Sequence, residues 1–239
     1  MTDPKVSVAI ATHNRACDLP QALDSVLAQD LEPGAYEVIV VDDGSTDETR
    51  KVLSRYRRQV RIVTQAHRGL ASACNHALTT ARGGYFARLD ADDTVHPTWL
   101  RRALAVLDRH PEACCVYPDY LHLLADGTRQ AVRLQEDNLY NLLACGTMFR
   151  TNALRTVGGF RSFFWEEYDL YLRLRTHGDF LHLPEVLYVY RKHPASMTAQ
   201  AEARRAGWRE LIRTWGKERL CAVGSCPELD DVLAEIQAP

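Results

Sequence analysis

The 239-residue chain has almost no net charge and no long apolar run, and each absence excludes a class of protein. Its 29 lysine and arginine residues nearly balance 31 aspartate and glutamate residues, for a net charge of −2 with histidine neutral. Nucleic-acid-binding proteins normally carry a strong basic excess, so nucleic acid is not an expected partner. No apolar run approaches the roughly 18 residues that a membrane-spanning helix requires. The first residues lead into an apolar strand without the apolar core of an export signal, so we expect a cytoplasmic protein.

Cysteine and glycine lack the spacing that two further kinds of site require. None of the seven cysteines forms a C-x-x-C pair, so a structural zinc site is not expected and the thiols are interpreted as reduced. Residues 12–18, which follow the first predicted strand, contain no glycine. A dinucleotide-dependent oxidoreductase places its glycine-rich phosphate loop at this point, so the sequence argues against that class.

Short apolar runs alternate with amphipathic stretches through the first half of the chain. The runs are typical of buried strands and cover residues 6–11, 37–41, 60–64, 85–89 and 113–117. The amphipathic stretches predict helices over residues 19–28, from residue 45 or 46 onward, 69–81 and 97–108. This alternation predicts an α/β fold with a mainly parallel central sheet and helices on both faces.

After residue 118 the regular alternation ends. A hairpin is predicted over residues 121–134 around Asp126-Gly127. Further strands are predicted at 142–149 and 186–190, and a helix at 165–176. We expect the sheet to become mixed in this half.

Polar clusters follow three of the predicted strands. They occupy residues 12–15, 42–45 and 90–93, with the sequences THNR, DDGS and DADD. The carboxyl ends of parallel strands share one edge of a sheet, so we expect the three clusters in one crevice. Asp90 and Asp92 are two residues apart and can both reach one divalent ion. Mg²⁺ and Mn²⁺ prefer such oxygen ligands and complete their shells with water and substrate phosphates, so a divalent metal and a phosphate-bearing ligand are expected.

Turns and helix caps are the alternative explanation for these acids. They account well for Asp47 and Asp93 and leave Asp42 undecided between the two. They explain Asp90 with Asp92 poorly, because a buried strand has little reason to end in three acids.

Taken in order, these segments resemble the family 2 glycosyltransferases, which have the Rossmann-like GT-A fold. The first strand with Thr12-His13-Asn14-Arg15 resembles the family's opening segment, with His13 where the family usually has tyrosine. Residues 37–49, EVIVVDDGSTDET, are similar to its second signature, and residues 69–75 to the helix that follows. Asp90-Ala91-Asp92 resembles its metal-binding D-x-D motif.

The resemblance implies a nucleotide-sugar donor, a UDP-sugar first among the candidates. Asp43 would hydrogen-bond the nucleobase, Asp90 would contact the ribose and the metal, and Asp92 would be the main ligand of Mn²⁺ or Mg²⁺. The donor-binding residues that it implies are Thr12, His13, Asn14, Arg15, Asp43, Arg68 and Asp90. For Arg68, which would reach the diphosphate, an exposed loop position is an equal alternative.

Two downstream motifs extend the resemblance. Trp165-Glu166-Glu167 resembles the family's E-D motif at a helix start, in which the second acid is the catalytic base, so Glu167 takes that role with Glu166 beside it. The alternative is that both acids merely favour a helix N-terminus. Residues 190–196, YRKHPAS, resemble the family's Y-R-x-H-x-x-S run, which makes His193 a further candidate metal ligand.

The resemblance also suggests how the chain is divided. Residues 1–198 would form one domain, with the nucleotide sugar bound by 1–117 and the acceptor and base provided by 118–198, followed by a helical tail over 199–239. In this tail an apolar stripe lies on a basic helix, which allows either contact with the inner face of a membrane or packing on the domain. The stripe consists of Trp208, Leu211, Ile212 and Trp215.

The sequence therefore predicts a metal-dependent, inverting glycosyltransferase that acts on a hydroxyl of a glycan or lipid-linked saccharide. A nucleotide-sugar-binding module with weak or no catalysis is the first alternative, because Glu167 and His13 depart from the family pattern. A sugar nucleotidyltransferase is the second, although the loop after the first strand lacks the glycines that it would need.

Overall fold

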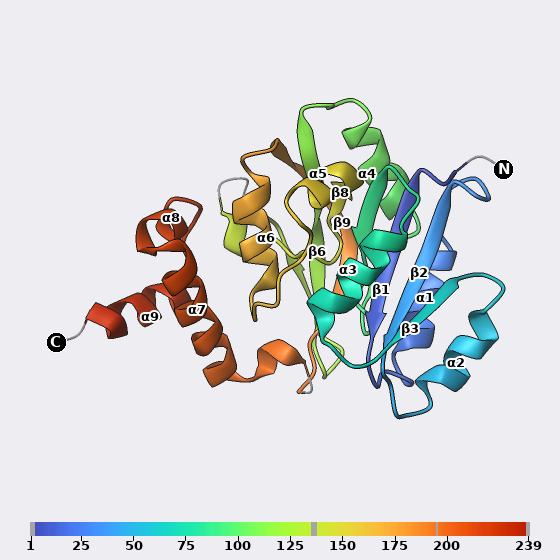
Figure 1. The fold of residues 1–239 in the computed structure, drawn as a ribbon, viewed down its shortest axis with the longest axis horizontal. Helices are drawn as coiled ribbons and strands as arrows, with labels where there is room; N and C mark the ends of the chain where they lie inside the picture. Colours follow the sequence, from blue (N-terminus) through green and yellow to red (C-terminus); the bar gives the residue numbers. More distant parts are fainter. Residues whose placement is uncertain (1–2, 135–137, 195, 238–239) are drawn as a thin grey trace.

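The computed structural model describes residues 3–134, 138–194 and 196–237, which form a curled sheet with helices around it (Figure 1). The strands of this part of the chain are β1 (Val6–Thr12), β2 (Tyr36–Asp43), β3 (Arg61–Gln65), β4 (Tyr85–Arg88), β5 (Thr94–Val95), β6 (Ala113–Leu123), β7 (Arg129–Val132), β8 (Met148–Arg150) and β9 (Asp179–Arg191). Its α-helices are α1 (Leu19–Leu27), α2 (Thr49–Tyr56), α3 (Leu70–Thr80), α4 (Trp99–Leu107), α5 (Thr151–Thr156), α6 (Glu166–Leu174), α7 (Ala201–Trp215), α8 (Lys217–Cys221) and α9 (Pro227–Gln237). The strand order is β3-β2-β1-β4-β8-β6-β9-β5, with β7 paired to β6.

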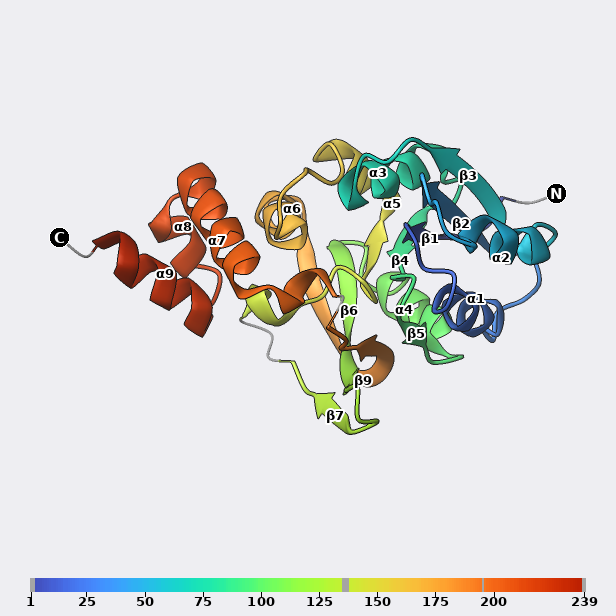
Figure 2. The same ribbon diagram turned by 90° about the horizontal axis from the view of Figure 1, so that it is seen from below.

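The first half of the sheet is parallel, as the sequence predicts. Strand β1 pairs with β2 on one side and with β4 on the other, and β2 pairs with β3. Helices α1 and α4 lie on one face of this region and α3 lies on the other (Figure 2). Val8, Ile10 and Val40 are completely buried between these layers, which explains why their strands are continuous apolar runs. The register places Thr12 opposite Asp42, so two of the polar clusters meet at one edge.

The second half is mixed, because β8 is antiparallel to β4 and β6 whereas β6 and β9 are parallel. The strand predicted over 142–149 is confined to Met148–Arg150. Its first residues are apolar because they pack inside the protein as a loop, and Gly146 interrupts extended backbone with φ 84°. A Cβ at Gly146 would lie 2.7 Å from the Tyr188 ring, so the close packing of this loop requires glycine.

Other elements also differ from the predictions: β6 extends to Leu123, and the short helix α5 was not predicted. Helix α2 begins at Thr49 rather than at Ser45 or Thr46, because the Asp47 carboxylate accepts the Thr49 N–H and ends the preceding loop. Strand β9 extends back to Asp179 through its parallel pairing with β6. The two-residue strand β5 was not predicted; it is too short to produce a periodic pattern.

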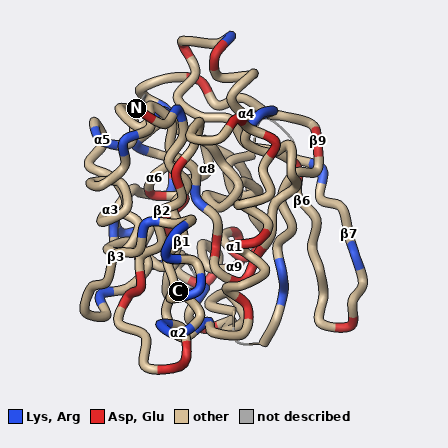
Figure 3. Tube along the Cα trace, turned by 90° about the vertical axis from the view of Figure 1, so that its right-hand side faces the viewer, with Lys and Arg blue, Asp and Glu red and all other residues tan. Residues whose placement is uncertain are grey.

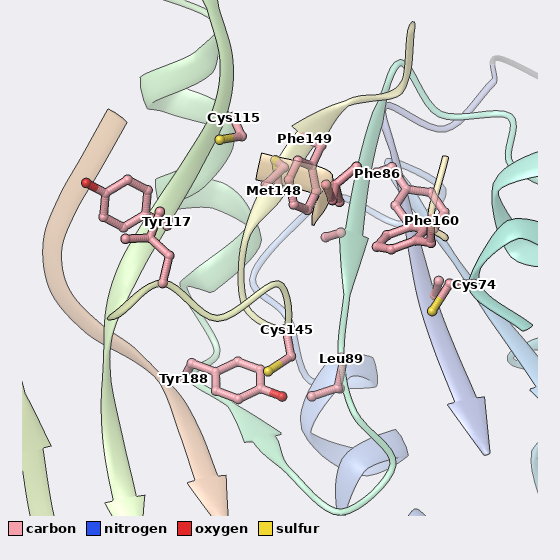
Figure 4. Close-up of a cluster of buried hydrophobic side chains, with 14 of the residues drawn as sticks. Cys74, Phe86, Leu89, Cys115, Tyr117, Cys145, Met148, Phe149, Phe160 and Tyr188 are labelled. Carbon is pink, nitrogen blue, oxygen red and sulfur yellow. The ribbon is translucent and has the colours of Figure 1, made fainter. Parts of the chain in front are cut away.

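Large side chains fill the space where the two halves of the sheet meet. Phe86 on β4 and Phe149 on β8 are fully buried there, and Tyr188 on β9 lies beside Cys145 (Figure 4). All seven cysteines carry free thiols. This core fixes the relative positions of β4, β8 and β9, whose ends build the site described below.

The C-terminal helices α7–α9 lie at one end of the molecule beside α6 (Figures 1 and 2). Trp208 and Leu211 of the predicted apolar stripe are fully buried, and Trp215 donates its Nε1–H to Asp169 of α6. Arg204, Arg205 and Arg209 of α7 pair with acids, as Arg204 does with Glu228 of α9. Trp208 and Leu211 of the stripe thus pack on the domain, the second of the two expected arrangements.

Acidic and basic residues are not segregated into separate parts of the chain. Acidic and basic segments are interspersed along the trace (Figure 3), as the near-neutral net charge leads one to expect. Within the described residues, no helix combines the length and the apolar character that crossing a membrane would take.

Candidate functional site

A cavity of about 490 Å³ opens at the carboxyl ends of β1, β2 and β4. Strand ends and the loops after them supply one wall, with Thr12, Asp43 and Asp90 among its residues. The opposite wall comes from the second half of the chain and includes Glu166 and Glu167 at the start of α6. Predicted donor-binding residues and the predicted base thus line one cavity. These lining residues are Thr12, His13, Arg15, Asp43, Asp90, Asp92, Glu166 and Glu167.

Asp43 organises the loop at residues 65–69. Its Oδ1 accepts hydrogen bonds from Gln65 Nε2 (2.7 Å) and the Arg68 N–H (2.9 Å). Its Oδ2 accepts from His67 Nδ1 (2.9 Å) and the Gly69 N–H (2.8 Å). Burial acts to raise the pKa of Asp43, but the bonds from Gln65, Arg68 and Gly69 outweigh it and lower the pKa. The carboxylate is therefore an ionised anchor that shapes the cavity wall, with both oxygens already bonded within the protein.

Two stacked imidazoles stand beside this anchor. The rings of His13 and His67 lie 4.0 Å apart with an angle of 23° between them. The Nδ1 atoms of both rings contact the Asp43 carbonyl oxygen, which can only accept, so each Nδ1 carries the proton. The His67 side chain is 59% exposed, and both histidines line the cavity. The pair offers flat surfaces for a nucleobase where the family usually has tyrosine.

Thr12 supplies an unsatisfied polar atom at the cavity. Among the described residues, its Oγ1 is a buried side-chain oxygen with no hydrogen-bond partner. Such an atom is costly unless a ligand or water completes it. Its place in the cavity wall supports the predicted role of Thr12 in ligand binding.

Two predicted donor-binding residues lie outside the cavity lining. The Asn14 Oδ1 accepts the N–H groups of Thr46 (2.8 Å) and Asp47 (3.3 Å), and its own φ is 53°. Asn14 therefore holds the loop after β2 against the loop after β1. The Arg68 side chain is exposed, and this residue contributes its backbone N–H to Asp43. For Arg68 the structure matches the alternative, an exposed loop arginine, and Asn14 is a loop-positioning residue.

Asp92 and His193 come together although they are far apart in the sequence. His193 Nε2 lies 3.0 Å from Asp92 Oδ2, and Arg15 NH2 lies 3.5 Å from the same oxygen. His193 itself lines an adjoining hollow that shares Ser196 with the main cavity. The 190–196 run is described except for Ala195, which lies outside the described residues.

Asp93 explains how His193 reaches Asp92. It is buried and accepts hydrogen bonds from the Tyr188 hydroxyl (2.6 Å) and the Arg191 N–H (2.7 Å). These bonds fasten the end of β9 to the acidic cluster. Burial and the nearby Asp90 charge raise the pKa of Asp93 well above its usual value. Asp93 is thus structural, as its alternative explanation predicted, and so is Asp42, which accepts from the Ser45 N–H and from Arg50.

Asp90 belongs to a buried charge network. Both of its carboxylate oxygens accept bonds from Arg88, at 2.8 Å from Nε and 3.2 Å from NH2. Arg88 also donates from NH1 to Glu166 Oε1 at 2.6 Å. Arg88 and Glu166 are both buried. Glu166 is therefore held by charge pairing rather than left free in the cavity.

Glu167 differs from its neighbour. It is half-buried and lines the cavity. Burial and the adjacent Glu166 charge raise its pKa well above the usual glutamate value. A carboxyl group with a raised pKa at a cavity wall is typical of a group that exchanges protons with a ligand. Asp169, one turn further along α6, is instead fully buried and bonded to Arg173 and Trp215.

The residues at Asp92 fit a hard divalent cation. A carboxylate oxygen and an imidazole nitrogen lie 3.0 Å apart here; the carboxylate suits both Mn²⁺ and Mg²⁺, whereas the imidazole suits Mn²⁺ better, because Mg²⁺ prefers oxygen ligands. Oxygen and sulfur atoms of Asp90, Asp93 and Cys145 also lie within 4.8 Å of one another. Asp90 is bonded to Arg88 and Asp93 to Tyr188, however, so this second group offers fewer free ligand atoms.

Arg88 and His67 were not identified by sequence analysis. Arg88 is the last residue of an apolar strand and matches no motif. Its role becomes visible only in its hydrogen bond to Glu166, which is distant in the sequence. His67 lies in a loop without periodicity. A charged residue at the end of an apolar strand, two residues before the D-x-D motif, was the available signal for Arg88.

Comparisons with known proteins show which family the chain is similar to. A family model described as glycosyl transferase family 2 matches residues 7–166. The putative glycosyltransferase EpsE of Bacillus subtilis is 32% identical over 206 residues, covering 79% of this chain and 73% of that protein. The uncharacterized protein y4gI of Sinorhizobium fredii is 33% identical over 249 residues, covering 94% of this chain. The chain spans 27% of the length of y4gI, so it corresponds to a part of that protein.

Solved structures show the same fold. TarS 1–349 of S. aureus, in complex with UDP-GlcNAc, has a TM-score of 0.71 at 22% identity, over 97% of this chain and 71% of that one. The mannosyltransferase PcManGT of Pyrobaculum calidifontis, in complex with GDP-Man and Mn²⁺, has a TM-score of 0.68 at 19% identity, over 99% and 80%. These likenesses confirm the predicted GT-A architecture. The family match covers more than half of the chain, and with the relationship to EpsE it shows that this chain belongs to glycosyl transferase family 2.

Proposed function

We propose that the chain is a metal-dependent, inverting glycosyltransferase that moves a sugar from a nucleoside-diphosphate donor to a hydroxyl acceptor. The observation that carries the proposal is the shared cavity, in which Glu167 lines one wall and the D-x-D residues line the other. We further propose that residues 1–117 bind the donor and that 118–198 provide the acceptor side. The solved TarS and PcManGT complexes, which hold UDP-GlcNAc and GDP-Man, support a nucleotide-sugar donor.

On this proposal the nucleobase stacks on the imidazole pair formed by His13 and His67. Asp43 contributes indirectly, because it holds the loop that carries His67. Thr12 Oγ1 gains its missing partner from the donor. Uracil is the base that we favour, in line with the UDP-GlcNAc that TarS binds.

Asp92 and His193 would hold the divalent ion, and Arg15 lies beside them as a positive group for the diphosphate. The ion, when bound, neutralises charge on the leaving diphosphate as a Lewis acid. Asp90 is bonded to Arg88 and contacts the donor rather than the ion in this arrangement.

Glu167 acts as the base. An acceptor hydroxyl is a weak nucleophile, and a carboxylate that takes its proton during attack on the anomeric carbon speeds the step. Attack from the face opposite the departing diphosphate inverts the anomeric configuration. The acceptor that we propose is a hydroxyl of a glycan or of a lipid-linked saccharide.

A thermal-shift and product-release experiment tests this function. UDP-GlcNAc and GDP-mannose are each added with and without Mn²⁺, and the release of nucleoside diphosphate is then measured. A true donor should raise the melting temperature most when Mn²⁺ is present, because ligands that bind the folded state stabilise it. A binding module would show the shift without release. A nucleotidyltransferase would instead release pyrophosphate from UTP and a sugar 1-phosphate.

A further inference from the structure

Arg88 links two parts of the site that are distant in the sequence. It is the last residue of β4 and is 5% exposed. From this position its guanidinium bonds Asp90 on the donor side through Nε and NH2, and Glu166 on the base side through NH1. One rigid, planar group therefore joins the D-x-D motif to the first residue of α6.

The start of α6 packs on α7 through aromatic rings but has no side-chain cap. The first N–H groups of a helix have no partner within the helix, and a cap side chain normally satisfies one of them. Trp165 occupies the cap position and makes no such side-chain bond. Its indole instead donates to the Arg204 carbonyl on α7 at 3.1 Å. The bond between Glu166 and Arg88 is thus the contact that ties the first turn of α6 to the sheet.

The charge balance points in the same direction. Glu166 has a side chain that is 3% exposed, and a buried carboxylate requires a paired cation. Without Arg88, the Glu166 carboxylate would lose its paired cation and would still be repelled by the neighbouring carboxylate of Glu167. Glu166 would then turn toward the cavity or take a proton, and either change would disturb Glu167 one residue on.

We propose that Arg88 is a positioning residue, which holds Glu166 and thereby keeps the carboxyl group of Glu167 at the cavity wall. This inference rests on the proposed function, since it gives Glu167 the role of base. The backbone of Asp90 is held independently of Arg88, because its N–H donates to the Tyr188 hydroxyl and its carbonyl accepts the Asp93 N–H. Loss of Arg88 should therefore disturb the base more than donor binding.

The test compares Arg88→Lys with a matched control, Arg173→Lys. Arg173 is also buried, lies on α6, and bonds Asp169 together with the carbonyls of Val157 and Gly159. A lysine amine keeps the charge but cannot reach both partners of a guanidinium. Release of nucleoside diphosphate from UDP-GlcNAc or GDP-mannose with Mn²⁺ gives kcat, calorimetry gives the affinity for UDP, and a melting curve gives stability.

Arg88→Lys should lower kcat by about 10²-fold, the cost of a misplaced reacting group, while the affinity for UDP changes far less. Arg173→Lys should lower the melting temperature to a similar extent and leave kcat close to wild type. An unchanged kcat in Arg88→Lys, or equal losses of kcat in the two variants, would overturn the role of Arg88.

Glu166→Gln and Glu166→Ala supply a second comparison in case Arg88→Lys does not fold. Glutamine keeps an oxygen that accepts from Arg88, whereas alanine removes it, so kcat should fall further in Glu166→Ala. Equal kcat values in these two variants would contradict the positioning role. If the wild-type protein releases nucleoside diphosphate from neither donor, the proposed function fails and takes this role with it, whereas an active wild type with an equally active Arg88→Lys rejects this role alone.

Discussion

At the scale of single residues, Asp92 is where metal binding should be most sensitive to mutation. Its Oδ2 lies 3.0 Å from His193 Nε2. Among the described residues, no other side chain from the second half of the chain contacts a carboxylate of the D-x-D motif at so short a distance. Asp92→Asn should reduce Mn²⁺ affinity by about 10-fold or more, since an amide is a weaker ligand than a carboxylate. Electron paramagnetic resonance of free Mn²⁺ in the presence of UDP measures this.

Asp30→Asn is the control for Asp92→Asn, because Asp30 is exposed and pairs with Arg101 away from the cavity. It should bind Mn²⁺ like the wild type. Chelation should also abolish release of nucleoside diphosphate. Full release in the presence of a chelator, or wild-type Mn²⁺ affinity in Asp92→Asn, would remove Asp92 from the proposed metal site.

Glu167 should control the pH dependence of turnover. Burial and the Glu166 charge raise its pKa, so the group stays protonated to a higher pH than an ordinary glutamate. A base must be ionised to accept a proton, and kcat should therefore increase with pH as Glu167 deprotonates. Glu167→Gln should lose this rise and most of its turnover while calorimetry still detects UDP binding. Its melting temperature should not fall, because the neutral amide removes the cost of a buried charge.

A second variant that keeps the carboxylate serves as the comparison for Glu167→Gln. Glu167→Asp retains the carboxylate with one methylene less, so it should keep more activity than Glu167→Gln. If Glu167→Gln loses UDP binding and turnover together, Glu167 is a structural residue. If its turnover and pH profile match the wild type, another group is the base.

The cavity-lining residues that sequence analysis predicted are those that belong to short local motifs. Asp92 and Asp90 stand in one D-x-D run, and Glu167 stands in a recognisable pair. Asn14 stays a predicted donor-binding residue: its amide oxygen accepts from Thr46, and its amide nitrogen lies 3.2 Å from Nε2 of the cavity-lining His13, which the motif does not reveal. Arg88 was missed because its role depends on Glu166, 78 residues further along the chain.

At the scale of secondary structure elements, α7 supports α6, which carries the proposed base Glu167. Trp208 is 1% exposed and stacks on Tyr168 at 5.3 Å and 17°, with Trp165 at 5.4 Å. Trp208→Ala should lower the free energy of unfolding by about 3–5 kcal/mol, because it leaves a cavity between the two helices. Urea denaturation measures this. Arg213→Ala, an exposed change on the same helix, should have little effect.

A loss below about 1 kcal/mol in Trp208→Ala, the size of an ordinary surface change, would mean that α7 contributes little to the fold. Binding of the wild-type protein to vesicles through this stripe would contradict its burial in the same way.

Periodicity predicted the elements well where each one buries a face of its own. Apart from the two-residue strand β5, the strands and helices of residues 6–108 follow from apolar runs and amphipathic spacing. The pattern misleads at 142–147, where Leu142 and Ala144 are buried as parts of a loop. It also misses the first residues of β9, because Pro184 and Glu185 interrupt the apolar pattern while backbone pairing with β6 continues on both sides of them.

At the scale of the whole molecule, buried acids give stability two opposing dependences on pH. Asp119 accepts hydrogen bonds from Arg133 (2.8 Å), the Leu134 N–H (2.9 Å) and His182 (2.8 Å). Burial acts to raise the pKa of Asp119, but these bonds outweigh it and lower the pKa. In Asp93 and Glu167, burial and neighbouring acids raise the pKa instead.

One substitution tests the contribution of the lowered pKa of Asp119 separately from that of the raised pKa values. A carboxyl group with a lowered pKa stabilises the fold at neutral pH, and this contribution disappears as the pH falls below its unfolded value of roughly 4 and through the lower folded value. The groups with raised pKa values behave oppositely, since their cost to the stability of the fold grows as the pH rises above roughly 4.

Asp119→Asn should therefore lower the free energy of unfolding at pH 7 by about 2 kcal/mol, the scale of hydrogen bonds to a charged group. It should also flatten the acid decline, so that the wild type and the variant converge near pH 3. Urea titrations at several pH values measure both effects, with Asp30→Asn as the exposed control, which should parallel the wild type throughout. Curves for Asp119→Asn that run parallel to the wild type at a constant offset would mean that other groups cause the acid decline.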